Sequence, residues 1–238
     1  IEGGRTVGNS ELSQKFFQSA IGDGKDVTRL LLTIGLLWSV DKQDEQFQQN
    51  VISTLAESLL STNYQINELA ILELQRIIGE DIAVIFGDML NKNRHTSNSK
   101  IIDILSILRS KKAVAILIEH LTDPIIKERV RNAIVSMREV AIEPLIDALR
   151  RSEEGFRQII VSVLVQIGSP TIEPLIDMLR RSEDSVRQEA VAVLVRIGGP
   201  AVPPLIEALG KPEISVRRAA VVALGQIGDV RGLEALTL

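Results

Sequence analysis

The 238-residue chain contains no cysteine, only two histidines and few aromatic residues, which make up 3% of it. Without cysteine there is no disulfide, no thiolate metal site and no cysteine nucleophile. His95 lies in a polar stretch where it should be solvated, and His120 should end a helix, where a cation suits the last carbonyls. We therefore predict no catalytic residue, no metal site and no cofactor, and we expect a protein that is not an enzyme.

Long apolar runs are also scarce. The most apolar run, Leu30 to Val40, has 11 residues, whereas a membrane-spanning helix needs about 20. We predict a buried helix there and no membrane span. The net charge of −4 does not favour nucleic acid as a partner. The absence of cysteine leaves the compartment open, and we take the cytoplasm as the expected location.

What the chain does have is a repeat, because one pattern occurs three times between residues 141 and 230. Each copy contains an apolar segment with proline, an apolar-arginine pair and a final Ile-Gly. Leu145, Leu175 and Leu205 occupy the same place in the three copies and give a period of 30 residues. A fourth copy opens at Arg231. A fixed period of this length predicts a solenoid of stacked units.

Each copy is predicted to contain two helices, here called helix A and helix B. In the second copy, helix A runs from Pro170 to about Arg181 and helix B from about Ser185 to Ile197. Asp184 is the expected N-cap of helix B, and Gly198 its left-handed C-cap. The apolar face of helix A has the spacing of one helical side: Ile172, Leu175, Ile176 and Leu179. Such a pair cannot cover its own apolar faces, so neighbouring copies must stack.

The order Pro-Leu-Ile-Asp-x-Leu, then Val-Arg-x-x-Ala-x-x-x-Leu, then Ile-Gly resembles the PBS-lyase-type HEAT-like repeat. The resemblance covers residues 141 to 236, and weaker copies extend it to about residue 51. It implies an all-α, right-handed α-solenoid of stacked antiparallel helix pairs, a HEAT/armadillo-like superhelix. The same repeat occurs in scaffolds, chaperone-like factors and chromophore lyases.

We predict a disordered or cut start over residues 1–9 and a single solenoid over 10–238. Its parts would be diverged N-terminal helices over 10–50, degenerate repeats over 51–140 and regular repeats over 141–238, the last incomplete. That unfinished repeat suggests a fragment of a longer protein. We expect a monomer, although an uncapped last repeat could stack end to end on another copy.

The individual helices before the regular repeats are expected over 10–21, 26–40, 45–60, 65–78, 81–91, 98–109, 112–122 and 125–137. Asp123 and Pro124 have the composition of a helix start, with an acidic cap and proline at the first position. The polar stretch from Asn91 to Lys100 is expected to protrude as a loop.

Two charged columns recur with the period. The acidic column, Asp147, Asp177 and Glu207, is expected to form surface ion pairs such as Asp177 with Arg180 and Arg181, rather than acid–base dyads. The arginine column, Arg157, Arg187 and Arg217, has two interpretations. It is either a ladder of pairs with acidic groups at the neighbouring A/B turn, such as Glu154 or Asp184, or a cationic stripe for phosphate or an acidic partner.

The resemblance implies that the B helices line the concave surface, the usual binding surface of such solenoids. The positions off the apolar stripe vary between copies: Gln158, Ile159, Ser162 and Gln166, then Gln188, Glu189, Ala192 and Arg196, then Arg218, Ala219, Val222 and Gln226. Ile159 and Val222 are apolar where polar residues would be harmless, which marks an interaction surface.

We therefore predict a non-catalytic scaffold or adaptor that binds a protein partner on this face. The alternative is a subunit of a phycobilin lyase/isomerase-like, chromophore-handling complex, for which the lack of cysteine is unfavourable. Nucleic-acid binding through the arginine columns is a third hypothesis, and the net charge of −4 counts against it.

Overall fold

The computed structural model describes residues 81–92, 98–181 and 183–237, together with Ile71, Gln75 and Gly79. The chain divides into two compact units, one ending at Leu108 and the other beginning at Arg109. The predicted helices over residues 10–60, nearly all of that over 65–78, the start over 1–9, and His95 lie outside the described residues. The predicted single solenoid over 10–238 therefore stays a prediction.

In the first unit, α5 (Asp81–Lys92) packs against α6 (Asn98–Leu108). The predicted pair over 81–91 and 98–109 is thereby confirmed to within one residue. Part of the expected loop over 91–100 is helical, because α5 continues to Lys92 and α6 begins at Asn98, whose side chain is buried. The remainder of that loop, 93–97, lies outside the described residues.

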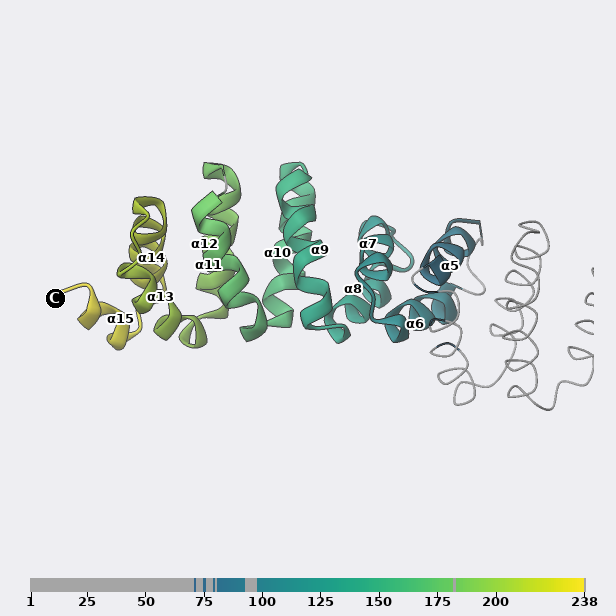
Figure 1. Ribbon diagram of the computed structural model, residues 1–238, viewed down its shortest axis with the longest axis horizontal. Coiled ribbons are helices and arrows are strands. Elements are labelled where there is room, and N and C mark those ends of the chain that lie inside the picture. The colour runs from purple at the N-terminus through teal and green to yellow at the C-terminus, as the bar shows by residue number, and fades with distance from the viewer. Residues whose placement is uncertain are drawn as a thin grey trace, which may run out of the picture. The chain divides into compact units, whose positions relative to one another are not determined.

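The second unit is a row of helix pairs (Figure 1). Its elements are α7 (Lys111–Glu119), α8 (Lys127–Ser136), α9 (Glu139–Arg151), α10 (Glu154–Ile167), η1 (Ser169–Thr171), α11 (Ile172–Arg181), α12 (Asp184–Ile197), η2 (Gly199–Ala201), α13 (Val202–Leu209), α14 (Ile214–Ile227) and α15 (Val230–Ala235). Helices α7, α9, α11 and α13 are A helices, and each packs against the B helix that follows it. The predicted all-α solenoid is confirmed, while its right-handed sense stays a prediction.

In both units one apolar position of the core recurs from copy to copy. Phe86 in the first unit and Leu117, Leu145, Leu175 and Leu205 in the second are all fully buried, as the alignment of the copies predicts. Burying one such side chain stabilises the fold by roughly 1.5–3 kcal/mol. Because each B helix also packs on the next, along the series α8, α10, α12 and α14, every repeat completes the core of its neighbour.

A residue with positive φ lies at each junction between repeats in the part of the chain that the structure describes. A positive φ occurs at Gly79, Arg109, Arg138, Gly168, Gly198 and Gly228, at intervals of 29 or 30 residues. At Gly198 φ is 75° and ψ is −133°, so the predicted positive φ is confirmed although ψ lies outside the left-handed helical range. Only glycine adopts such a conformation without strain. The degenerate repeats keep this turn with arginine in place of glycine.

Two expected helix starts differ from the structure by one or two residues. Asp184 is the first residue of α12 rather than its N-cap, which is Glu183. After Asp123 the chain forms a turn before α8 begins at Lys127, and the Asp123 carboxylate accepts the backbone N–H groups of Ile125 and Ile126 at 2.8 and 3.3 Å. These bonds satisfy donors in a turn, so Pro124 precedes the helix instead of opening it.

Asp229 is the N-cap of α15, the last helix that the structure describes. The Asp229 side chain accepts the backbone N–H of Arg231 at 3.0 Å and pairs with the Arg231 guanidinium at 2.8 Å. The hydrogen bonds from Arg231 lower the pKa of Asp229 from 3.8 to about 2. A lowered carboxyl pKa stabilises the folded state at pH values above the ordinary pKa of 3.8, where the carboxylate is charged. That contribution is lost as the pH falls toward 2.

Among the described residues, no single helix is both long and apolar enough to cross a membrane. Two helix pairs reach that length together, Glu154–Ile167 with Ser169–Arg180 and Asp184–Ile197 with Gly199–Leu209, but each is bent by more than 110°.

The positive φ at the junctions leads to stability predictions of opposite sign at two equivalent positions, Arg138 and Gly198. Arg138→Gly should stabilise the fold by roughly 1 kcal/mol, because it relieves a positive φ of 49° at an exposed side chain. Gly198→Ala should destabilise it by about 1–3 kcal/mol, although the space around a new Cβ is open. Urea unfolding followed by circular dichroism measures both; changes of the same sign would contradict this account of the junctions.

Candidate interaction surface

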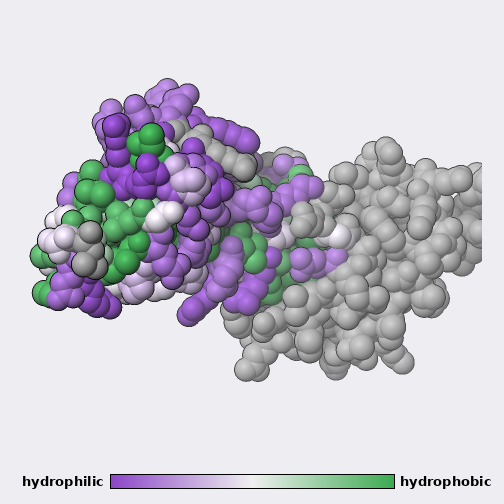
Figure 2. Space-filling view, turned by 60° about the vertical axis from the view of Figure 1, so that its left-hand side comes forward, coloured by the Kyte–Doolittle hydropathy of each residue, from purple (hydrophilic) through white to green (hydrophobic). Residues whose placement is uncertain are grey.

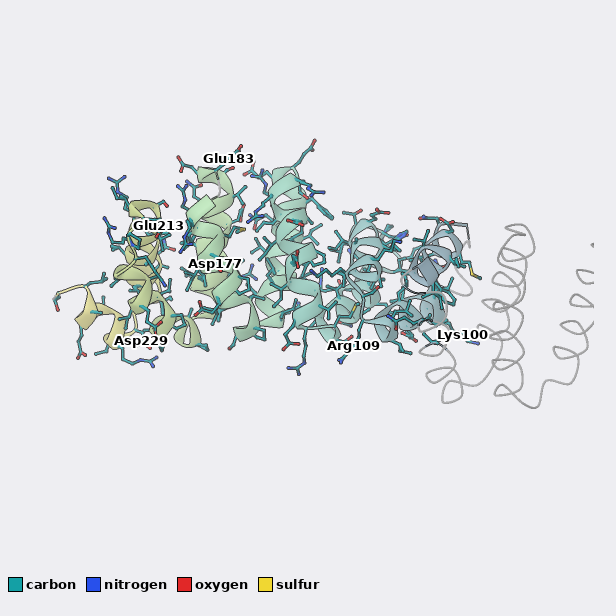
Figure 3. The ribbon with its side chains drawn as sticks, viewed as in Figure 1. Lys100, Arg109, Asp177, Glu183, Glu213 and Asp229 are labelled. Carbon is teal, nitrogen blue, oxygen red and sulfur yellow. The ribbon has the colours of Figure 1, made fainter. Side chains whose placement is uncertain are left out.

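The three C-terminal B helices form a continuous face. Helix α10 packs beside α12, and α12 beside α14. Glu183 and Glu213, which precede α12 and α14, both lie toward one edge of the row, and Asp229 lies at the opposite edge (Figure 3). Because these B helices run in the same direction, residues 30 apart form columns across the face.

The structure places most of the predicted binding positions at the surface. Those that are exposed are Gln158, Gln166, Gln188, Arg196, Arg218, Val222 and Gln226. Four others are half-buried: Ile159, Ser162, Glu189 and Ala192. Ala219 is buried. Ile159 is therefore less accessible than its place off the apolar stripe suggests.

A groove of about 730 Å³ lies between α12 and α14. Each of its two walls is formed by one face of a single helix. The α12 wall consists of Asp184, Arg187, Gln188, Val191 and Ala192, and the α14 wall of Ile214, Ser215, Arg218, Ala219, Val222 and Gln226. Five of the predicted binding residues line it: Gln188, Ala192, Arg218, Val222 and Gln226. Ala219 lines it as well. The predicted positions on α10 do not line it.

The two neighbouring pairs of B helices differ at one bridging position. Across the preceding helix pair, the Gln158 amide of α10 donates to both carboxylate oxygens of Glu189 on α12, at 3.0 and 3.1 Å. The equivalent positions in the next pair are Gln188 and Ala219. An alanine cannot accept that bond, so α12 and α14 have no such bridge across their surface.

The pattern-based prediction missed the apolar end of the groove. Ile214 is 59% exposed, at the start of α14. Its equivalents in the earlier copies are Glu154 and Asp184. Comparing this column between copies shows an isoleucine in place of two carboxylates, a signal that was present in the sequence. Figure 2 shows exposed apolar surface gathered at the C-terminal end of the row.

The arginine column has a structural role. Arg157 donates to the carbonyl oxygen of Ser152 at 2.8 Å, and Arg187 donates to that of Leu179 at 3.2 Å. Arg217 donates to the carbonyl oxygens of Lys211 and Pro212 at 2.9 and 2.6 Å. Arg157 and Arg187 thus bond to carbonyls at the C-terminal ends of α9 and α11, where intrahelical donors run out. Arg217 instead bonds to the loop that follows α13.

The expected ladder of arginine–carboxylate pairs is therefore only partly right. Arg187 also pairs with Asp184, whereas Arg157 and Arg217 donate to backbone carbonyls. Free carbonyls at a helix end attract the planar guanidinium without any acidic neighbour. The bonds of Arg157 and Arg217 to neutral carbonyls orient each guanidinium without neutralising its charge.

The surface ion pairs near the acidic column are of two kinds, one within a helix and one between repeats. Asp147 lies 3.6 Å from Arg150, three residues later, as predicted. Arg180, the expected partner of Asp177, instead has its Nε 3.0 Å from Glu213 of the next repeat. Such half-exposed pairs contribute about 0–1 kcal/mol. The pair of Arg180 with Glu213 links one repeat to the next rather than supporting α11 alone.

A second hollow of about 640 Å³ lies between the A helices α9 and α11. Charged side chains dominate its edge, among them Glu139, Glu143, Asp147, Arg150 and Arg180. Four of these are engaged in ion pairs: Glu143 with Lys111, Asp147 with Arg150, and Arg180 with Glu213. Paired charges give a partner little to gain, so this hollow is the weaker candidate.

In the part of the chain that the structure describes, no group of His, Cys, Asp and Glu side chains is arranged to hold a metal ion. His120 is the C-cap of α7, as the sequence predicts. The described residues around the groove supply hydrogen-bond donors, charge and apolar surface.

The structural role of the arginine column can be tested on one helix. Arg187→Ala should lower the free energy of unfolding by about 1 kcal/mol, because it leaves the Leu179 carbonyl without its donor. Arg196→Ala removes the same charge from an exposed position on α12 and should change it by less than about 0.5 kcal/mol. Equal effects of the two variants on urea unfolding would argue against the capping role.

Comparison with known proteins gives one family match. A family model described as HEAT repeats matches residues 172–237. No curated protein matches the chain. The crystal structure of an engineered protein from the Northeast Structural Genomics Consortium is similar over 90% of this chain and 68% of that chain, with 14% identity and a TM-score of 0.31. A TM-score this low carries no argument about the fold.

The matched residues extend from α11 to α15 and include both walls of the groove. The family model and the row of helix pairs agree on the same kind of repeat. Residues 172–237 therefore match HEAT repeats, and the groove between α12 and α14 lies within them.

Proposed function

We propose that the protein is a non-catalytic scaffold or adaptor that binds a segment of a partner protein in the groove between α12 and α14, on a concave surface lined by B helices. HEAT repeats generally serve as protein-interaction scaffolds. The observation that carries the proposal is the pair of exposed apolar side chains in this groove, Ile214 at 59% and Val222 at 48%. Apolar side chains grouped in an exposed groove favour a binding site over plain solvent contact.

The dimensions of the groove suit a peptide segment. Its α14 wall runs from Ile214 to Gln226, which is about 18 Å at the helical rise of 1.5 Å per residue. That length accommodates about three turns of a partner helix or five to six residues of an extended chain. Val191 and Ala192 from α12 complete the apolar lining.

The groove is also preformed. Both walls are helices whose opposite faces lie in the core, where Val193 and Leu194 on α12 and Ala223 and Leu224 on α14 are buried. A partner therefore meets a surface that needs little ordering, which reduces the entropic cost of binding. The mechanism we propose is complementarity of shape and surface, with no covalent chemistry.

The other hypotheses have less support. The phycobilin lyase/isomerase alternative requires a tetrapyrrole site, and none of the described residues favours one. Nucleic-acid binding draws on several cations acting together, and the net charge of −4 counts against it. A cytoplasmic location and a monomeric state remain expectations from the sequence.

The proposal predicts which apolar surface residue matters. Val222→Glu should weaken partner binding at least about tenfold, because it places a charge in the apolar part of the groove. Ile125→Glu is the matched control, since Ile125 is 64% exposed in the turn before α8 and does not line the groove. The measurement is affinity capture with the full chain, followed by isothermal titration with each captured partner.

A second variant tests the groove by closing it. Ala219→Glu restores the residue types of the bridge between Gln158 and Glu189, so Gln188 can bond across the groove. This variant should also abolish binding while the helical content stays unchanged. If partners bind Val222→Glu and Ala219→Glu as tightly as Ile125→Glu, the proposed site is wrong.

A further inference from the structure

We propose that the α12–α14 groove selects partner segments in which a carboxylate lies between two aliphatic side chains. This inference rests on the proposed function, because it names the kind of segment that the groove takes. It starts from three residues of α14, Ile214, Arg218 and Val222, which line the groove and are all exposed. In this row a single cation stands between two apolar side chains.

The row has a defined spacing. Residues four apart lie on the same helix face, one turn and about 6 Å from each other. The equivalent rows in the two preceding copies are Glu154, Gln158 and Ser162 on α10, and Asp184, Gln188 and Ala192 on α12. Neither has a cation at the centre or apolar side chains on both sides of it. The chemistry is specific to the third copy, where the groove is open.

The charges in the groove do not balance. Asp184 is the one acidic residue in its lining, and Arg187 on the same helix pairs with it. Arg218 has no hydrogen-bond or ion-pair partner among the residues that the structure describes. The lining thus carries one uncompensated positive charge beside apolar surface. A carboxylate meets a guanidinium through two parallel, charge-assisted hydrogen bonds, which also fix its orientation.

The spacing of the row sets the spacing of the ligand. In an extended segment, side chains two residues apart point to the same side and lie about 6.6 Å apart. An apolar residue, any residue, an acidic residue, any residue and a second apolar residue therefore match Ile214, Arg218 and Val222 in turn. In a helical segment, residues four apart give the same separation of about 6 Å.

A nucleic-acid phosphate could also meet Arg218, but the apolar residues argue against it. Ile214 and Val222 gain nothing from a phosphate backbone, and nucleic-acid affinity comes from several cations acting together. The chain has a net charge of −4. The favoured occupant is consequently an acidic, aliphatic peptide segment of a protein partner.

Selection from a displayed library of random peptides, each roughly a dozen residues long, tests the inference on the full chain. Enriched peptides should carry Asp or Glu with aliphatic residues two or four positions away on both sides. Binding of the enriched peptides is then measured by fluorescence anisotropy with purified variants. Arg218→Glu should weaken it at least about tenfold, since the reversed charge repels the carboxylate.

Arg151→Glu is the matched control, because Arg151 is an exposed arginine on α9 that does not line the groove. It should leave the dissociation constant unchanged, although it makes the same change in net charge. Equal weakening by both variants would mean that only overall charge matters and would overturn the inference. Enrichment of basic or purely apolar peptides, or displacement of the peptide by single-stranded DNA, would overturn it as well.

The two proposals fail in different ways. If Ala219→Glu abolishes peptide binding but Arg218→Glu does not weaken it, the groove binds segments without selecting a carboxylate. The proposed function then stands and the further inference falls. If no peptide is enriched, or if enriched peptides bind Ala219→Glu as tightly as the unaltered chain, both proposals fall.

Discussion

The structure depends on each helix pair burying the apolar face of the next. No pair can cover the side chains of its own column, so Leu145, Leu175 and Leu205 are buried only because the copies stack. This constraint explains why the framework residues recur at 30-residue intervals while the outward positions of the B helices are free to change. A repeat whose interior is kept constant can carry a different surface in each copy, and the groove arises in this way.

Stacking also requires the chain to reverse direction at each junction. The backbone conformation of these turns is kept even where the residue type changes. The positive φ persists at Arg109 and Arg138, where glycine has been replaced. The geometry of the turn is set by the packing of neighbouring helices, which outweighs the local strain of about 1–3 kcal/mol. The degenerate repeats are thus the same structural unit as the regular ones.

Much of this fold could be predicted from the sequence, because apolar spacing, proline and glycine act locally. The limits of α5, α6 and α12 agree with the predicted ones to within one residue. What could not be predicted depends on partners distant in the sequence. Arg180 bonds to Glu213, 33 residues later, instead of Asp177. The missing bridge across the groove is of the same kind, since it depends on Gln188 and Ala219 on two different helices.

The central claim is that a partner segment lies between α12 and α14, and methyl NMR of the full chain with a bound peptide tests it most directly. The account predicts that chemical-shift changes and contacts to the peptide concentrate at Ile214, Val222 and Val191, which line the groove. The methyl groups of Ile142 and Ile146, in the hollow between α9 and α11, should be unaffected. Contacts at Ile142 and Ile146 with none in the groove would contradict the account.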